Sequence, residues 1–74
     1  MRLSKLLKDY SLNSDIQYFE MILESLENGQ RKQAVSQFNQ LPKQSRKDFL
    51  LWAMTAHETP KLNQSTFSTL LNQL

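Results

Sequence analysis

The chain has 74 residues, a formal net charge of +2 and no cysteine. These totals exclude a multidomain protein, a disulfide framework and a thiolate metal site, and the charge is too small to indicate nucleic-acid binding by itself. We predict one domain over residues 1–74 with no membrane contact, because the longest apolar run, residues 49–54, is far shorter than a span of roughly 20 residues.

The composition and the N-terminal segment both indicate helix. Leucine, glutamine, glutamate and lysine dominate, whereas β-branched aliphatic residues are nearly absent. Lys5, Lys8 and Asp9 interrupt the N-terminal leucines, so the segment is unlike a signal peptide and we predict a cytoplasmic protein. Apolar residues at i, i+3, i+4 and i+7 form one stripe of a short first helix: Leu3, Leu6, Leu7 and Tyr10.

A second helix is predicted between a capping signal and a stop signal. Ser14 is a favourable N-cap and Asp15 places negative charge in the first turn, while Gly29 is the expected left-handed residue after the helix. Its predicted core stripe is Ile16, Phe19, Ile22, Leu23 and Leu26. Its opposite face carries Glu20, Glu24 and Glu27.

Three further helices are predicted at residues 31–41, 43–57 and 64–73. Pro42 ends the third helix and can occupy the first position of the fourth, and Pro60 ends the fourth region. The third helix has an apolar stripe of Ala34, Val35, Phe38 and Leu41. It has an outer face of Lys32, Gln33, Ser36, Gln37 and Gln40. The connections are short, so we predict an all-α fold: a small compact bundle of four to five antiparallel helices.

The stretch "DFLLWAM", residues 48–54, belongs to the fourth helix. At about 100° per residue, one face holds Phe49, Trp52, Ala53 and Ala56, and an adjoining face holds Leu50 and Met54. We therefore predict a central helix that the second and third helices cover on one side and the terminal helices cover on the other. Leu51 falls among the polar residues of this helix, so the run is either entirely core or carries one exposed leucine.

The stretch "NGQRKQAVSQF" resembles the helix–helix turn of a tetratricopeptide repeat over a single turn. The resemblance is carried by Gly29, Ala34 and Phe38, which have the spacing G-x4-A-x3-F. It implies an αα-hairpin in which a small residue permits close approach of the two helices. No second copy follows at the repeat spacing, so a solenoid is not predicted.

A DNA-binding helix-turn-helix is the alternative interpretation of the same segment, with the helix at about 31–41 as its recognition helix. Its lysine, glutamine and serine side chains suit contacts with base edges and phosphates. Against this, Glu24 and Lys32 stand where that motif normally buries apolar residues.

Five cations cluster in the sequence: Arg31, Lys32, Lys43, Arg46 and Lys47. They could bind phosphates or an acidic partner. Because the third and fourth helices are predicted to be antiparallel, their basic N-terminal turns are expected at opposite ends. Cations near a helix N-terminus also oppose its dipole, and such local misfits sometimes mark binding positions.

Catalysis has little support in the sequence. His57 is the only histidine, and the carboxylates are scattered, so neither a nucleophile–base pair nor a metal-ligand cluster is predicted. We predict a non-catalytic adaptor or regulatory accessory protein without a cofactor, acting through contact with a protein partner or with a second copy as a homodimer. The candidate contact residues are Tyr18, Met21 and Leu51, with the five cations as further candidates.

Overall fold

Five α-helices, and no strand, occur in the residues that the structure describes, 2–58 and 60–74 of a computed structural model. The helices are α1 (Leu3–Asp9), α2 (Asp15–Glu27), α3 (Arg31–Gln40), α4 (Lys43–Thr55) and α5 (Gln64–Leu71). The predicted all-α bundle is confirmed. None of the helices in these residues combines the length and apolar character that crossing a bilayer requires.

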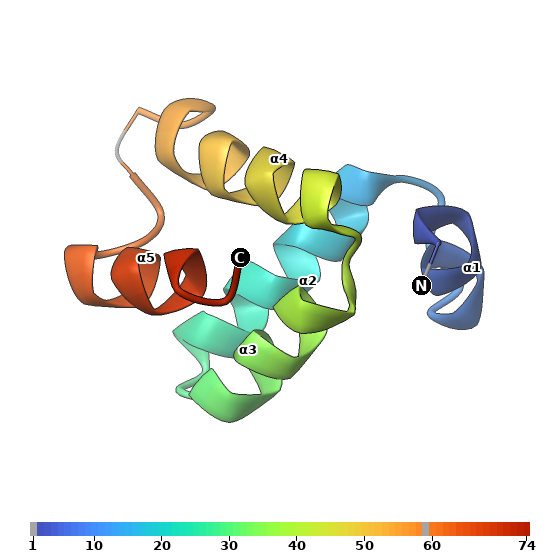
Figure 1. The fold of residues 1–74 in the computed structure, drawn as a ribbon, viewed down its shortest axis with the longest axis horizontal. Helices are drawn as coiled ribbons and strands as arrows, with labels where there is room; N and C mark the ends of the chain where they lie inside the picture. The colour runs from blue at the N-terminus through green and yellow to red at the C-terminus, as the bar shows by residue number, and fades with distance from the viewer. Residues whose placement is uncertain (1, 59) are drawn as a thin grey trace.

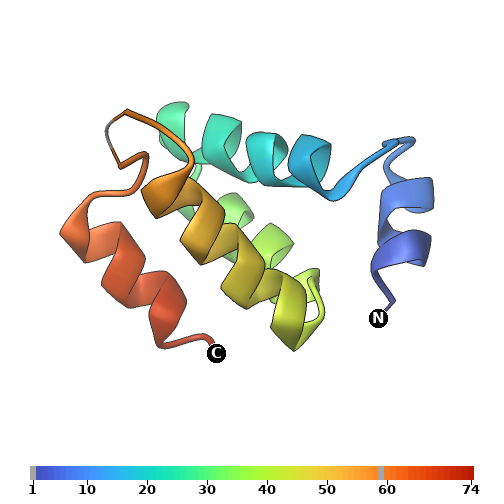
Figure 2. The ribbon, with the colours of Figure 1, turned by 90° about the horizontal axis from the view of Figure 1, so that it is seen from above.

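Successive helices from α2 to α5 reverse direction, as their short connections predict (Figure 1). The α2–α3 hairpin has the most extensive interhelical packing in the described residues, and α5 returns alongside α4 (Figure 2). The first helix stands at the N-terminal end of α2, and its main packing partner is α2. It was expected to help cover the fourth helix, but α5 is the terminal helix that packs on α4.

The ends of α2 are set by the two predicted signals. Ser14 Oγ accepts a hydrogen bond from the backbone N–H of Gln17 at 3.3 Å. At the other end, Gly29 has φ +76°, its N–H donates to the carbonyl of Leu26, and the N–H of Gln30 donates to the carbonyl of Ser25. This pair of bonds is a Schellman motif, which satisfies carbonyls that the helix end would leave unpaired.

Replacing Gly29 with alanine should lower the free energy of unfolding by about 1–2 kcal/mol. A Cβ at this position would meet nothing within 4 Å, so the cost comes from the left-handed backbone alone. Gly29→Asn should cost less, because asparagine tolerates this conformation. Urea unfolding of both variants checks this, and an equal loss for alanine and asparagine would contradict it.

The fourth helix begins at Lys43, as predicted. Pro42 is its N-cap residue and not its first helical residue, with φ −56° and ψ 154°. The helix also ends at Thr55, so His57 lies beyond it, with its ring edge-on to Trp52 at 4.8 Å between centroids.

The core is centred on α4, where Phe49 and Ala53 are fully buried. The Phe49 ring makes edge-to-face contacts with Phe19 of α2 at 5.4 Å and with Phe38 of α3 at 5.8 Å. Such aromatic pairs add to the large apolar area that each ring buries. The predicted central position of residues 49–54 is thereby confirmed, with the α2–α3 hairpin on one face of α4.

Candidate contact surface between α4 and α5

An apolar groove of about 350 Å³ lies between α4 and the C-terminal segment. One wall is Lys47, Leu50, Leu51 and Met54 of α4. The other wall is Phe67 and Leu71 of α5, together with Leu74. The groove exists because α4 has a wider apolar arc than α5 can cover. Leu50 is buried beside α5, whereas the next residue, Leu51, turns about 100° further round the helix.

The two most exposed large hydrophobic residues of the described chain both line this groove. Leu51 is 65% exposed and Leu71 is 46% exposed. The other two exposed large hydrophobic residues, Tyr10 and Ile16, lie outside it. A single exposed leucine needs no explanation, but leucines gathered on one concave surface with half-buried neighbours are typical of interaction sites.

The charge on the α4 wall is positive. Lys47 lines the groove, and Lys43 is exposed one turn earlier on the same side of the helix. The nearest acid in the sequence, Asp48, is about 100° further round and accepts a hydrogen bond from Gln44 Nε2 at 3.0 Å. The α5 helix has no charged residue. The groove is therefore apolar with a basic end.

Tyr18, a predicted contact residue, is fully buried in the core. Its hydroxyl donates to the backbone carbonyl of Gln37 at 2.7 Å. The buried face of α2 is rotated relative to the prediction, because Ser25 is also buried while Ile16 is 37% exposed. Tyr18 is thus unavailable to a partner in this fold.

Gln37 was expected on the outer face of the third helix but is also buried. Its Oε1 accepts a hydrogen bond from Ser25 Oγ at 3.0 Å, and its carbonyl accepts the bond from Tyr18. These contacts form a polar seam between α2 and α3. These hydrogen bonds make the burial of Gln37 tolerable, because a buried polar group is costly unless it is hydrogen-bonded.

Met21 is half-buried and lies on a different surface from Leu51. It lines two shallow pockets beside α2, one shared with Tyr10 and the other with Leu12. No described pocket contains both Met21 and Leu51. The structure therefore does not join these two candidates into one contact site.

The five predicted cations have different environments. Arg31 donates from Nη2 to Ser65 Oγ at 3.4 Å and to Thr69 Oγ1 at 3.2 Å, so it links α3 to α5. Arg46 donates from Nη1 to the carbonyl of Gln73 at 2.8 Å, linking α4 to the segment after α5. The three lysines, Lys32, Lys43 and Lys47, are exposed, and the last of them lines the groove. Both arginines thus support the position of α5.

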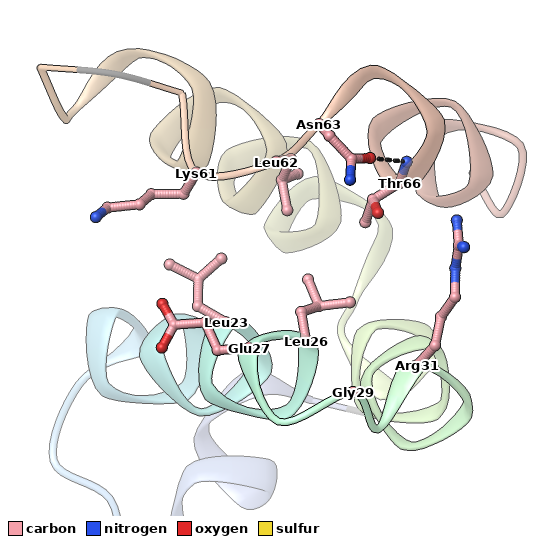
Figure 3. Close-up of a pocket in the computed structure, with 9 residues that line it drawn as sticks. All are labelled: Leu23, Leu26, Glu27, Gly29, Arg31, Lys61, Leu62, Asn63 and Thr66. Atoms are coloured by element: carbon pink, nitrogen blue, oxygen red, sulfur yellow. Dashed lines mark hydrogen bonds between the residues drawn. The ribbon is translucent and has the colours of Figure 1, made fainter.

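A second cavity of about 350 Å³ lies between the α2–α3 turn and the start of α5 (Figure 3). Two of its polar side chains, Asn63 and Arg31, already have structural roles. Asn63 Oδ1 caps α5 by accepting from the N–H of Thr66 at 2.7 Å, and Arg31 extends toward α5. Leu23 and Leu62, which also line it, are buried core residues. This cavity is explained by helix packing and capping.

An acidic cleft lies between α2 and the end of α4. It is lined by the three glutamates of α2 together with Trp52, His57 and Lys61. In the described residues, no group of three or more His, Cys, Asp or Glu side chains is arranged to hold a metal ion. The cleft therefore adds no metal site to the apolar groove.

The chain matches no protein-family model, no curated protein and no solved structure. Its function has to be inferred from the chemistry of its own surface.

Proposed function

We propose that this is a small non-catalytic helical protein that acts through protein–protein contact, as an adaptor or regulatory accessory protein of the cytoplasm. The contact surface is the groove between α4 and α5. The observation that supports it is the joint exposure of Leu51 and Leu71 on that one groove. Burying this exposed apolar area against a partner would stabilise the complex by about 25 cal/mol per Å² removed from water.

Placing a charge in the groove should abolish partner binding without unfolding the chain. Leu51→Glu adds a carboxylate to the apolar wall, while the exposure of Leu51 keeps the loss of stability within about 0.5 kcal/mol. The measurement is quantitative affinity capture from the native cell with wild type and variant as baits, after thermal unfolding has shown equal stability. Partners retained by wild type should be lost from Leu51→Glu.

Ser36→Glu is the matched control, because it adds the same charge at an exposed position on α3 outside the groove. It should retain the wild-type partners. If Leu51→Glu captures the same proteins as Ser36→Glu, the groove is not the contact surface and the proposal fails.

Nucleic-acid binding by α3 is the alternative function, and it has less support. Gln37 is buried, and Arg31 and Asn39 are already hydrogen-bonded to the C-terminal segment. These contacts leave Lys32, Gln33 and Ser36 as a small exposed polar surface on α3. Saturable binding to mixed DNA or RNA at low salt, weakening as salt rises, would favour this alternative.

A further inference from the structure

We infer that the groove between α4 and α5 binds an amphipathic α-helix of a partner protein, with acidic residues flanking its apolar stripe. This inference rests on the proposed function and specifies the chemistry of the partner. It depends on the spacing of the groove residues and on the charge at one end of the groove.

The spacing of the groove residues fits a helix. On α4, Lys47, Leu50, Leu51 and Met54 have the spacing i, i+3, i+4 and i+7, which spans two helical turns or about 10 Å. On the other wall, Phe67, Leu71 and Leu74 have the spacing i, i+4 and i+7. Two helices lying side by side form a trough in which a third helix can pack its own ridge of side chains. A partner with apolar anchors at i, i+3 or i+4, and i+7 matches this length, as in other helix-in-groove complexes.

The charge of the groove favours acidic flanks on that helix. Lys43 and Lys47 are exposed on the groove side of α4, and α5 contributes no charge. Lys43 also lies in the first turn of α4, which contains no acid, so it opposes the helix dipole there. Carboxylates of a partner placed beside the two lysines would compensate this unfavourable arrangement. Complementary charge of this kind steers encounter and fixes the orientation of the bound helix.

A second copy of the chain fits this surface less well. In a two-fold pairing, each copy would bring Lys43 and Lys47 to the interface and no Asp or Glu side chain from the groove walls. The acidic helix α2 cannot serve as the ligand either, because its apolar side chains Phe19 and Ile22 are buried in the core. The partner therefore has to supply an amphipathic helix that is unoccupied before binding.

The test is selection from a displayed library of random peptides about 20 residues long, a length at which isolated helices begin to form. Wild-type protein is the target, and Leu51→Glu is the counter-target that removes peptides bound elsewhere. We expect the enriched sequences to show helical apolar spacing with Asp and Glu outnumbering Lys and Arg. An enriched peptide, synthesised and titrated, should bind Leu51→Glu at least tenfold more weakly than wild type and Ser36→Glu.

The charge requirement is tested by repeating the selection on Lys43→Glu/Lys47→Glu. Both lysines are exposed, so this variant should fold, and it should now enrich basic amphipathic helices. The inference would be overturned if wild type enriched basic peptides, proline-rich peptides or peptides in which apolar and polar residues alternate. It would also be overturned if wild type enriched no peptide more strongly than Leu51→Glu does. Concentration-dependent dimerisation in sedimentation that Leu51→Glu removes would also overturn it, because a second copy would then fill the groove. In each of these cases, the proposed function would still be supported if affinity capture with Leu51→Glu loses native partners that wild type retains.

Discussion

Phe49→Ala should lower the free energy of unfolding by about 3–5 kcal/mol, the usual cost of truncating a buried phenylalanine. The side chain is fully buried and contacts rings from two other helices, Phe19 and Phe38. The substitution would therefore leave a cavity at the point where α2, α3 and α4 meet. Domains of this size have small stability margins, so much of the variant should be unfolded at 25 °C. Denaturant unfolding followed by far-UV circular dichroism measures the loss.

Leu51→Ala is the control on the same helix, because it removes a similar apolar side chain from an exposed position. It should change the free energy of unfolding by no more than about 0.5 kcal/mol. Similar losses for both variants would mean that α4 packs on the bundle with a different face, and the proposed groove would then be covered.

The order and approximate limits of the helices could be predicted because their signals are local. Ser14 and Gly29 act through hydrogen bonds and backbone geometry within a few residues of the helix ends. Pro42 likewise breaks the helical pattern between α3 and α4 wherever the rest of the chain lies. Such signals are present in the sequence before any tertiary contact forms.

The buried face of α2 could not be read from hydropathy, because it depends on where α3 packs. Ile16 is apolar and belongs to the predicted stripe, yet it is exposed. Tyr18 is buried because α3 brings the carbonyl of Gln37 within reach of its hydroxyl. A polar side chain is tolerated in a core when a distant residue supplies its partner, and helical periodicity does not contain that information.

The candidate groove could be predicted only in part. The position of Leu51 on the helical wheel marked it as a residue outside the α4 core, and its exposed fraction agrees with that position. Leu71 was not singled out, because Leu70 and Leu71 are adjacent apolar residues and only the placement of α5 distinguishes them. Leu70 is fully buried whereas Leu71 faces the groove. Arg31 and Arg46 contribute to that placement through contacts across more than 25 residues of sequence, which no local pattern contains.

Tyr18→Phe should lower the free energy of unfolding by about 1–3 kcal/mol, because it leaves a buried carbonyl without its hydrogen bond. Gln37 lies in the last turn of α3, where carbonyls lack partners within the helix. The Tyr18 hydroxyl satisfies that carbonyl at 2.7 Å. Tyr10→Phe is the matched control, because the Tyr10 hydroxyl is exposed and its bond to Gln40 Oε1 is 3.4 Å long. Urea unfolding at neutral pH should show a loss of no more than about 0.5 kcal/mol for Tyr10→Phe.

Alkaline pH provides a second measurement of the same residue. Burial raises the pKa of the Tyr18 phenol well above its ordinary value, and the neighbouring Tyr10 raises it further. In the unfolded chain the phenol ionises near its ordinary pKa of about 10, so ionisation above that pH favours unfolding. The stability that Tyr18 contributes is thus complete below about pH 10 and is lost progressively as the pH rises further. Above this pH, the free energy of unfolding of wild type should fall more steeply than that of Tyr18→Phe, so the difference between the two should narrow. If the two free energies fall in parallel, Tyr18 ionises freely in the folded protein and is not buried as described.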